Sequence, residues 1–562
     1  MFATALAIGL LAPAIGAQQQ PAQRELPPVA TAHDRASAAA QPGSDNAKGH
    51  GRRDIEPPAA VDPETYRREK AAAVHGPAPT GAEIVAEPGA GSDQGAAASQ
   101  APSVALSFNG LDRPGAVNNG FVFNPPDTIV AKSPNRVLEG ANSALRLFTN
   151  TGSVIQTQNL NSFFGASTSS GLLFDPKVFY DRNSPNPRFF VVALQVAGRD
   201  DSITSNDVSR IRVAVSRSPN PSSLASSNWC RYNIDGRRNV GTSNVSWADY
   251  PAIGVGRDSF SFAMNQFRFT DGAFRFAVIH VWNKNIAENN ASSCPTVPRF
   301  TFQPSGTVGN FSRFTIQPAQ SYTSPSSFSG TTNPAYYLST TRGSSSQYHV
   351  YRVRNVAGGS PTLASLTLTG GSYGIPPDSP QPSSSIRIDT GDNRMLQVAG
   401  IGNNLVGMFT TVCNFTSGTA NESCTRAPRV RVGQSGTGGL TASLPENTFA
   451  GVGNNIFVHH SSIATNTSLR SASNWESSGA TRSLRSDARI KNVNAGWTNV
   501  STYAPGSCSL PPTPPSTTTA RSGDYSGAQL DPSLTSFWLA GEQAVPISSA
   551  CQWRTRIARL VP

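Results

Sequence analysis

The chain has 562 residues, which is enough for several ordinary domains or for one large repeat fold. Only 14% of the residues are charged, whereas 49 glycines and 43 prolines provide many turns. This composition argues against a helical cytosolic protein and favours an all-β protein of the extracellular kind.

The formal net charge is +11, and the positive charge lies mostly after residue 100. Residues 18–100 carry 8 Lys and Arg against 11 Asp and Glu, whereas the rest of the chain carries 37 against 23. Most of this positive charge is arginine, which suits a glycan or another anionic polymer as partner. The alternative is that the use of arginine in place of lysine reflects the composition of the genome. No basic run has interleaved aromatic residues, so no nucleic-acid partner is predicted.

The N-terminal part is predicted to lie outside the folded domain. Residues 1–17 have the pattern of a secretory signal peptide that ends at Ala17, so we expect a secreted protein, extracellular or at the cell surface. No later run reaches the roughly 18 apolar residues of a membrane anchor. Residues 18–100 are rich in Ala, Pro, Gln and Gly, which predicts a disordered linker or propeptide without a site. Within it, residues 64–76 predict only one or two marginal helical turns.

Residues 103–562 predict a β-propeller. Residues 103–111, SVALSFNGL, alternate apolar and polar residues and predict a strand that completes the last repeat from the other end of the chain. Strand–turn–strand units then recur and predict seven four-stranded blades, with six as the alternative. The repeats are expected to start at Pro126-Asp127, Asp175-Pro176, Asp249-Tyr250-Pro251, Asn333-Pro334, Asp392-Asn393, Glu446-Asn447 and Asp531-Pro532.

Six cysteines in an exported chain favour disulfides. None has CxxC spacing, so a cysteine-bound zinc is not predicted. We predict Cys413–Cys424, which closes a short hairpin, and Cys230–Cys294 and Cys508–Cys551 within one blade or between neighbouring blades. Each disulfide is expected to stabilise the fold by roughly 2–4 kcal/mol.

Acidic residues recur at several repeat starts, namely Asp127, Asp175, Asp249 and Asp392. An acid at the same place in several blades would direct carboxylates toward one end of the central channel. Asp127, Asp175 and Asp249 could then hold a structural Ca²⁺ through oxygen ligands, or the acids could supply an acid/base pair for glycoside chemistry. The alternative is that each aspartate caps a turn by accepting local backbone N–H groups. No other cofactor is predicted.

His459-His460 is the one adjacent histidine pair in the sequence. Neighbouring residues of a strand point to opposite faces, so the two histidines are predicted not to share a metal. The common nucleophile, zinc and nucleotide motifs are absent from the sequence.

Four stretches carry a resemblance to a known group of proteins. PPDT (125–128), FDPKVFYD (174–181), RVAVSRSPNP (212–221) and ADYPAIGVG (248–256) resemble exported bacterial β-propeller proteins of sialidase-like architecture, which are mostly uncharacterised. Residues 216–229 are similar to the Asp-box turn of such blades, with Asn220 where an aspartate is expected. The resemblance implies the fold and not the activity, because no motif brings Tyr180, Tyr250 and Glu139 together for sialidase chemistry.

Three functions are open at this point. The first is an exported, monomeric binding protein that contacts a cell-surface or extracellular glycan, and the missing catalytic motifs favour it. The alternative is a glycoside hydrolase or lyase that uses carboxylates at the channel mouth. The third is a structural surface-attachment protein with residues 18–100 as its tether.

Overall fold

The computed structural model describes residues 34–36 as backbone, and residues 62–84, 101–118, 124–167, 171–198, 207–304, 313–323, 333–415, 420–513 and 518–561 with their side chains. The predicted signal peptide, residues 1–17, lies outside the described residues, as does most of the predicted linker. Within the described part, no helix combines the length and the apolar character needed to cross a membrane.

Strand pairing divides the described chain into antiparallel sets of four. In chain order the sets are β4 (Ile129–Lys132), β5 (Arg136–Ala141), β6 (Ala144–Thr149) and β7 (Val154–Asn159); β8 (Leu173–Asp181), β9 (Arg188–Ala197), β10 (Val208–Ser216) and β11 (Trp229–Asp235); β12 (Ser246–Val255), β13 (Ser259–Arg268), β14 (Phe274–Asn283) and β15 (Val297–Phe302); β16 (Gln317–Pro318), β18 (Ala335–Thr340), β19 (Ser345–Arg354) and β20 (Thr362–Tyr373); β23 (Met395–Ile401), β24 (Asn404–Cys413), β25 (Glu422–Gln434) and β26 (Leu440–Gly451); β27 (Ile456–Thr465), β28 (Ser471–Gly479), β29 (Arg482–Lys491) and β30 (Ser501–Ala504); and β32 (Gly527–Leu530), β33 (Phe537–Ile547) and β34 (Ala550–Val561) with β3 (Ser103–Asp112).

The remaining elements join or cover these sets. The short strands are β1 (Asp34–Ala36) on β15, β2 (Glu83–Ile84) on β26, β17 (Gln320–Thr323) between β12 and β23, and a small sheet of β21 (Ser379–Gln381), β22 (Ser384–Asp389) and β31 (Thr519–Arg521). The helices are α1 (Pro63–Ala73), α2 (Leu160–Phe164) and α3 (Lys284–Asn289), with 3-10 turns at Pro114–Ala116 and Ser226–Asn228.

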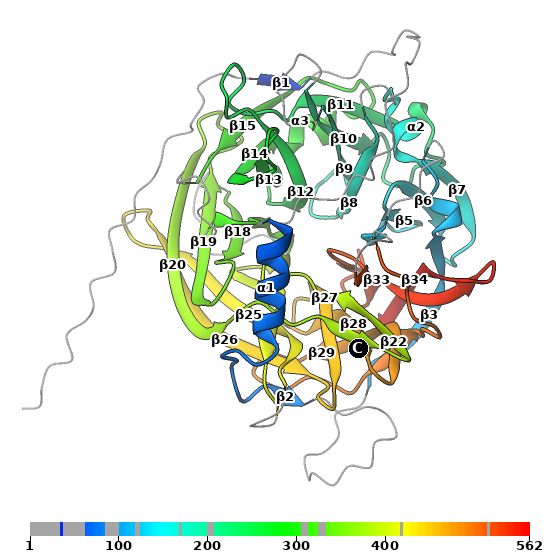
Figure 1. Cartoon of the computed structure of the whole chain (residues 1–562). Helices are drawn as coiled ribbons and strands as arrows, with labels where there is room; N and C mark the ends of the chain where they lie inside the picture. Colours follow the sequence, from blue (N-terminus) through cyan, green and yellow to red (C-terminus); the bar gives the residue numbers. More distant parts are fainter. Residues whose placement is uncertain are drawn as a thin grey trace, which may run out of the picture.

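The sets are arranged as a closed ring (Figure 1). The first strand of each set contacts the first strand of the next, in the order β4, β8, β12, β16, β23, β27 and β32, and β32 contacts β4 again. The chain is therefore an all-β protein with the β-propeller fold, and the described pairing is compatible with the predicted seven blades. Three repeat starts were predicted wrongly: Asn333 precedes the second strand β18, Glu446 lies in the outer strand β26, and Asp531 follows β32.

Each blade buries both faces, which explains the continuous apolar runs in its strands. Residues 189–194 of β9 read FFVVAL and are all buried. Their side chains alternate between two hydrophobic clusters, because Phe190, Val192 and Leu194 pack on one side and the residues between them on the other. The interfaces between blades therefore form the core of the protein.

The ring closes through its N-terminal strand, as predicted. β3 pairs antiparallel with β34, from Ser103 opposite Val561 to Asp112 opposite Arg554, and the two strands lie side by side in Figure 1. Glu139 of β5 fastens this strand to the first blade, because its carboxylate accepts the Leu111 backbone N–H at 2.9 Å and the Thr555 hydroxyl.

Glu139→Gln is expected to weaken the pH dependence of stability. Burial raises the pKa of Glu139 from 4.5 to about 7, so the folded chain holds a proton that the unfolded chain has released. The stability from this proton is fully present below about pH 4.5 and is lost as pH rises through about 7, by roughly 3 kcal/mol. Denaturant unfolding of both proteins at pH 4.5 and 7.5 measures the difference. Glu446→Gln is the control, because Lys491 and Arg429 lower the pKa of Glu446 against the effect of burial. The stability from this carboxylate is present above about pH 4.5 and is lost below it, so its removal should leave the dependence between pH 4.5 and 7.5 nearly unchanged.

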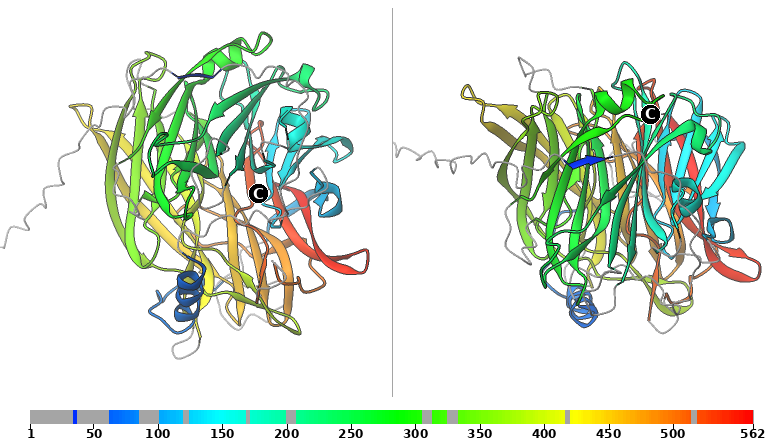
Figure 2. Two further views of the ribbon diagram at one scale, coloured as in Figure 1. Left: turned by 45° about the horizontal axis from the view of Figure 1, so that its top comes forward. Right: turned by 90° about the horizontal axis from the view of Figure 1, so that it is seen from above.

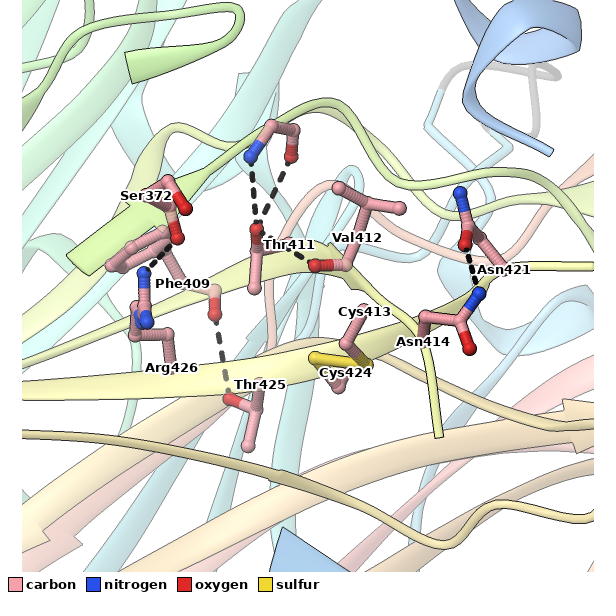
Figure 3. Close-up of a disulfide and its surroundings, with 11 residues drawn as sticks. Ser372, Phe409, Thr411, Val412, Cys413, Asn414, Asn421, Cys424, Thr425 and Arg426 are labelled. Carbon is pink, nitrogen blue, oxygen red and sulfur yellow. Dashed lines mark hydrogen bonds between the residues drawn. A yellow bond between two sulfur atoms is a disulfide. The ribbon is translucent and has the colours of Figure 1, made fainter. Parts of the chain in front are cut away.

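The structure contains three disulfides, and they join the cysteines that the sequence analysis paired: Cys230–Cys294, Cys413–Cys424 and Cys508–Cys551. Figure 3 shows the disulfide between β24 and β25, with Asn414 and Asn421 directed toward each other beside it. Asn421 accepts from the Asn414 side chain at 2.9 Å and donates to the carbonyls of Ala73 and Gly76 at 2.8 and 2.9 Å. The disulfide-linked hairpin thus binds the end of α1.

Helix α1 lies within the segment that the sequence analysis predicted to be disordered and without a site. Asp62 caps its first turn by accepting the backbone N–H groups of Glu64 and Thr65. The helix lies against one face of the ring (Figures 1 and 2). Because its own apolar surface is small, its polar contacts with the propeller decide whether it stays bound.

Candidate functional site

Several inner strands are interrupted near their beginning by a β-bulge. Shifts in register mark these bulges in β8, β12 and β27. Residues with a left-handed backbone at such places, or directly before an inner strand, are Asp127 (φ 47°), Asp175 (φ 51°), Tyr250 (φ 53°), Thr315 (φ 52°) and His460 (φ 42°).

A left-handed backbone at a non-glycine residue costs roughly 1–3 kcal/mol, and it persists only where the surrounding structure enforces it. A bulge also interrupts the two-residue alternation of the strand and so redirects the side chain. Such strain is concentrated at functional sites in proteins. The repeated bulges therefore mark this end of the ring as the candidate site.

Asp127 and Asp175 meet at one side-chain amide. Asn142 donates from Nδ2 to Asp127 Oδ2 at 2.8 Å and to Asp175 Oδ1 at 3.5 Å, while its Oδ1 accepts the Asp175 backbone N–H at 2.7 Å. The two aspartates are only 1% and 5% exposed. The structure thus brings together two of the predicted site residues, from neighbouring blades, and we call them the acid pair.

The surroundings of the acid pair favour protonated carboxyl groups. Burial raises the pKa of both aspartates, and the negative charge of Asp524 raises it further. Asp524 is close because its backbone N–H donates to Asp127 Oδ1 at 2.6 Å. Arg521, and for Asp175 also Lys177, act in the opposite direction. The acid pair can therefore hold a proton at a higher pH than isolated aspartates do.

Aromatic and cationic side chains adjoin the acid pair. The Lys177 ammonium lies over the Tyr525 ring and 5.5 Å from the centre of the Tyr250 ring. Tyr250 donates to the Asp524 carbonyl at 3.0 Å, and its ring lies 4.5 Å from the Arg394 guanidinium carbon. Burial lowers the pKa of Lys177. The site thus combines acids, bases and ring faces in one small volume.

Asp392 has a different role from the acid pair. It pairs with Arg394 at 2.7 Å and with Arg342 at 3.1 Å, and it accepts the Arg394 backbone N–H at 3.1 Å. Burial acts to raise its pKa, but the two arginines outweigh burial and hold the pKa below the usual value. Asp392 therefore corresponds to the structural, turn-capping alternative.

At the third repeat the bulge residue is Tyr250 and not the predicted Asp249. Asp249 is buried and lies opposite Asn265 in the ladder between β12 and β13. The equivalent position is thus aspartate in two blades and not in four. A structural Ca²⁺ at Asp127, Asp175 and Asp249 stays a prediction, and Lys177 and Arg521 already bring positive charge to the acid pair.

Helix α1 is anchored beside this site by Lys70. Its buried ammonium donates to Thr390 Oγ1 at 2.8 Å and to the Gly391 carbonyl at 2.6 Å, and it pairs with Asp378 at 3.0 Å and Asp389 at 3.4 Å. A fully satisfied buried ammonium is strongly bound, whereas its removal leaves the acids without their cation.

Lys70→Met is therefore expected to detach α1 and to expose it to protease. Limited digestion with chymotrypsin, which cleaves after the α1 residue Tyr66, should be at least about tenfold faster in this variant, because cleavage requires local opening. Arg68→Met is the matched control, because Arg68 lies on the exposed surface of α1 and its hydrogen bond goes to Thr65 of the same helix and not to the propeller. Equal cleavage rates in the two variants would contradict the anchoring role of Lys70.

A second cluster of chemically active residues lies in the next-to-last blade. His459 Nδ1 and His460 Nδ1 are 3.1 Å apart, and Glu476 Oε2 lies 3.8 Å from the first and 3.4 Å from the second. All three side chains are buried. The prediction that the two histidines point to opposite faces is wrong, because the bulge at His460 cancels the alternation.

One surface pocket lies between the first blade and the closing blade, where the inner strands β4 and β32 end. It has a volume of about 480 Å³ and is lined by Lys132, Trp538, Arg559 and Asn150, among others. The Lys132 ammonium lies 5.6 Å from the centre of the Trp538 ring, and burial lowers its pKa to about 8. This pocket places two cations, and the acid Asp531 that accepts the Trp538 ring N–H, beside an aromatic residue.

No family model and no curated protein matches the sequence. Among solved structures, the chain is similar to an α-L-arabinofuranosidase from Fusarium graminearum in complex with an iminosugar inhibitor, at 9% identity, over 81% of this chain and 98% of that chain, with a TM-score of 0.35. An α-L-arabinanase from Penicillium chrysogenum matches at 8% identity, over 81% and 98%, with a TM-score of 0.34. Drosophila Plexin A in complex with Semaphorin 1b matches at 8%, over 82% and 88%, with a TM-score of 0.33.

At these identities and TM-scores the similar structures say nothing about function. They also add no support to the resemblance to sialidase-like proteins. Strand pairing defines a disulfide-linked β-propeller. Its strained residues lie at the end of the ring where the inner strands begin. Any activity has to be inferred from the site itself.

Sequence reasoning missed several residues of the site. Asn142 and Asp524 belong to no motif. Asn142 reaches the acid pair from the turn between β5 and β6, and Asp524 reaches it from the closing blade through the ring closure. Lys177 and Tyr250 stand next to predicted aspartates, in the DPK and DYP tripeptides. The recurrence of proline after Asp175 and after Tyr250 is the signal that could have identified the bulge positions.

Proposed function

We propose that the chain is a glycoside hydrolase whose acid pair, Asp127 and Asp175, acts at the inner end of the propeller. The contact of both carboxylates with the single Asn142 amide carries this proposal. Glycosidic hydrolysis uses one carboxylic acid to protonate the leaving oxygen and one carboxylate as nucleophile or base. The raised pKa values of the acid pair suit the first role, and the nearby cations suit the second.

The surroundings support a sugar as substrate. Lys177 and Arg394 offer hydrogen-bond donors to the hydroxyl groups of a sugar, and the rings of Tyr250 and Tyr525 pack against these two cations. Because the acid pair is buried, substrate must reach it by movement of the segment around Asp524 and Tyr525, which contacts Asp127 and Pro176. Closure of this segment would exclude water from the reacting bond.

The spacing of the acid pair favours retention of configuration. Asp127 Oδ2 and Asp175 Oδ1 contact the same nitrogen at 2.8 and 3.5 Å, so their separation cannot exceed the sum of these distances. Retaining enzymes hold their carboxyl groups about 5–5.5 Å apart, whereas inverting enzymes need about 6.5–9.5 Å. A covalent glycosyl intermediate on one of the two aspartates is the consequence.

The proposal is tested with the purified full chain and a panel of neutral and acidic oligosaccharides. New reducing ends should form, and proton NMR of the first product should show the anomer of the substrate. Products of inverted configuration would reject the assigned spacing. No hydrolysis of any member of a broad panel, by a folded chain with intact disulfides, would reject the enzyme and leave glycan binding as the function.

Glycan binding without hydrolysis is the second candidate, and the pocket around Lys132 favours it. A tryptophan beside Lys132 and Arg559 suits a sugar that carries a carboxylate or sulfate. Lys132→Met should remove binding of acidic oligosaccharides on a glycan array and leave neutral ones unchanged. Secretion, as residues 1–17 predict, agrees with the three disulfides, which are typical of oxidising compartments.

A further inference from the structure

We propose that His459, His460 and Glu476 form a binding site for a divalent transition metal, with Zn²⁺ as the best fit. The three ligand atoms, Nδ1 of each histidine and Oε2 of the glutamate, all lie within 4.8 Å of one another in a buried part of the propeller. Two imidazoles and one carboxylate are a ligand set that zinc and its neighbours prefer, whereas Ca²⁺ prefers oxygen ligands alone.

The distances between the ligand atoms match tetrahedral geometry. They are 3.1, 3.4 and 3.8 Å. With metal–ligand bonds of about 2.0–2.1 Å, neighbouring ligands of a tetrahedron are about 3.3–3.4 Å apart, whereas those of an octahedron are about 2.9 Å apart. The observed set is centred on the tetrahedral value, which favours Zn²⁺ over Mn²⁺ or Fe²⁺.

The backbone is built to bring these three residues together. His459 lies directly opposite Glu476 in the ladder between β27 and β28, so the two side chains share one face of the sheet. His460 joins them because the bulge and its left-handed backbone, with φ of 42°, bring its ring beside that of His459. In a regular strand, His460 would point to the opposite face of the sheet from His459. The strained backbone at His460 thus places both histidines beside Glu476.

A chain of hydroxyl groups fixes the tautomer of His459. Its Nε2 lies 3.2 Å from Ser478 Oγ, Ser478 donates to Ser379 Oγ at 2.7 Å, and Ser379 donates to the Pro380 carbonyl at 3.1 Å. Because a carbonyl only accepts, each member of this chain donates onward, and the imidazole proton must lie on Nε2. The lone pair of Nδ1 is then free for a metal, which is the usual arrangement around metal-bound histidines.

The cluster is otherwise poorly compensated. Glu476 Oε1 and His460 Nε2 have no hydrogen-bond partner among the described residues, and without a metal a single proton on His460 Nδ1 has to serve both His459 Nδ1 and Glu476 Oε2. A buried cation would stabilise this arrangement, because unpaired buried polar groups are costly. Ser522 Oγ lies 3.4 Å from His460 Nδ1 and also hydrogen-bonds Glu476, so it adjoins the cluster.

The test uses the full chain without a histidine tag, stripped with a chelator and then titrated with ZnCl₂ by calorimetry. We expect one zinc per chain, a rise in melting temperature on zinc addition, and strong visible absorption with Co²⁺, which reports tetrahedral coordination. A folded wild-type chain that binds neither Zn²⁺ nor Co²⁺, or that shows only weak octahedral Co²⁺ absorption, would overturn the proposal.

Variants assign the binding to these residues. Glu476→Gln should weaken zinc binding by at least about 100-fold, and Ser478→Ala, which removes only the partner of His459, by about 10–100-fold. His349→Gln is the matched control, because His349 is also buried but contacts Thr341 and Thr367 in another blade. Equal zinc affinity in Glu476→Gln, Ser478→Ala and the control would place the metal elsewhere and reject the site. Ser478→Ala keeps the proposal testable if Glu476→Gln fails to fold.

Discussion

Asp175→Asn is expected to reduce glycoside hydrolysis by about 10²–10⁴-fold while the propeller stays folded. Asparagine has the shape of aspartate but cannot take up or release a proton. Its side-chain oxygen can still accept from Asn142, and the backbone N–H at this position still donates to Asn142 Oδ1. Because burial already disfavours a charged carboxylate here, loss of the charge should leave the melting temperature within a few degrees.

Paired variants would assign the two roles. The variant that lacks the general acid should keep activity on aryl glycosides with an acidic leaving group, which departs without a proton. The variant that lacks the nucleophile should lose activity on every substrate. We therefore compare Asp127→Asn and Asp175→Asn on one aryl glycoside and one oligosaccharide.

Asp235→Asn is the control for these assays, because Asp235 lies in the outer strand β11 and pairs with Arg237. It should retain wild-type turnover. If Asp127→Asn and Asp175→Asn also retained it, the acid pair would be a structural cluster and the proposed mechanism would be wrong.

Lys284→Met is expected to destabilise the fold by about 3–5 kcal/mol. Lys284 at the start of α3 pairs with Asp181 at the end of β8, and both side chains are fully buried. Glu288, one turn further along α3, is also buried, and its pKa is raised by burial and by Asp181. Removal of the one ammonium thus leaves two acids without their cation. Denaturant unfolding, checked by proteolysis in case unfolding is irreversible, measures the loss.

Two comparisons make this result specific. Arg268→Met breaks the partly exposed pair with Asp271 and should cost less than about 1 kcal/mol. Asp181→Asn combined with Lys284→Met should recover part of the lost stability. In the wild-type chain Asp181 accepts the Asn183 backbone N–H at 2.9 Å, and the amide oxygen of asparagine can accept it too. No recovery would show that the methionine itself packs badly.

The sequence identified the acid pair in part. Asp127 and Asp175 were singled out because they recur at repeat starts, and a repeat places equivalent residues at one end of a ring. Asp249 and Asp392 were singled out by the same reasoning, yet one lies beside the bulge residue and the other binds two arginines. Recurrence locates a position along the strand but does not give the local backbone angle, which decides where the side chain points.

The histidine cluster shows the limit of this reasoning most clearly. Alternation along a strand is a property of regular backbone, and it separates His459 from His460. The bulge that reunites them is stabilised by contacts from elsewhere, such as the Ser526 hydroxyl, which donates to the His460 carbonyl at 2.6 Å. The partner Glu476 lies on the neighbouring strand, where only the register of the hairpin brings it opposite His459.

The sequence by itself determined what local pattern can specify: an all-β chain of repeated strand–turn–strand units, a first strand that closes the ring, and the pairing of the six cysteines. The repeats and the closing strand follow from two-residue periodicity and turn residues, Cys413–Cys424 follows from its short spacing, and the other two pairs follow from pairing within one blade or between neighbouring blades. The tertiary structure alone decided which side chains meet at the inner end of the ring, and that Lys70 anchors α1 onto a face that residues 18–100 were not expected to reach. The reason is physical: the contacts of Asp524 and of Lys70 join residues hundreds of positions apart, and those within neighbouring strands depend on strained backbone angles that the assembled ring stabilises.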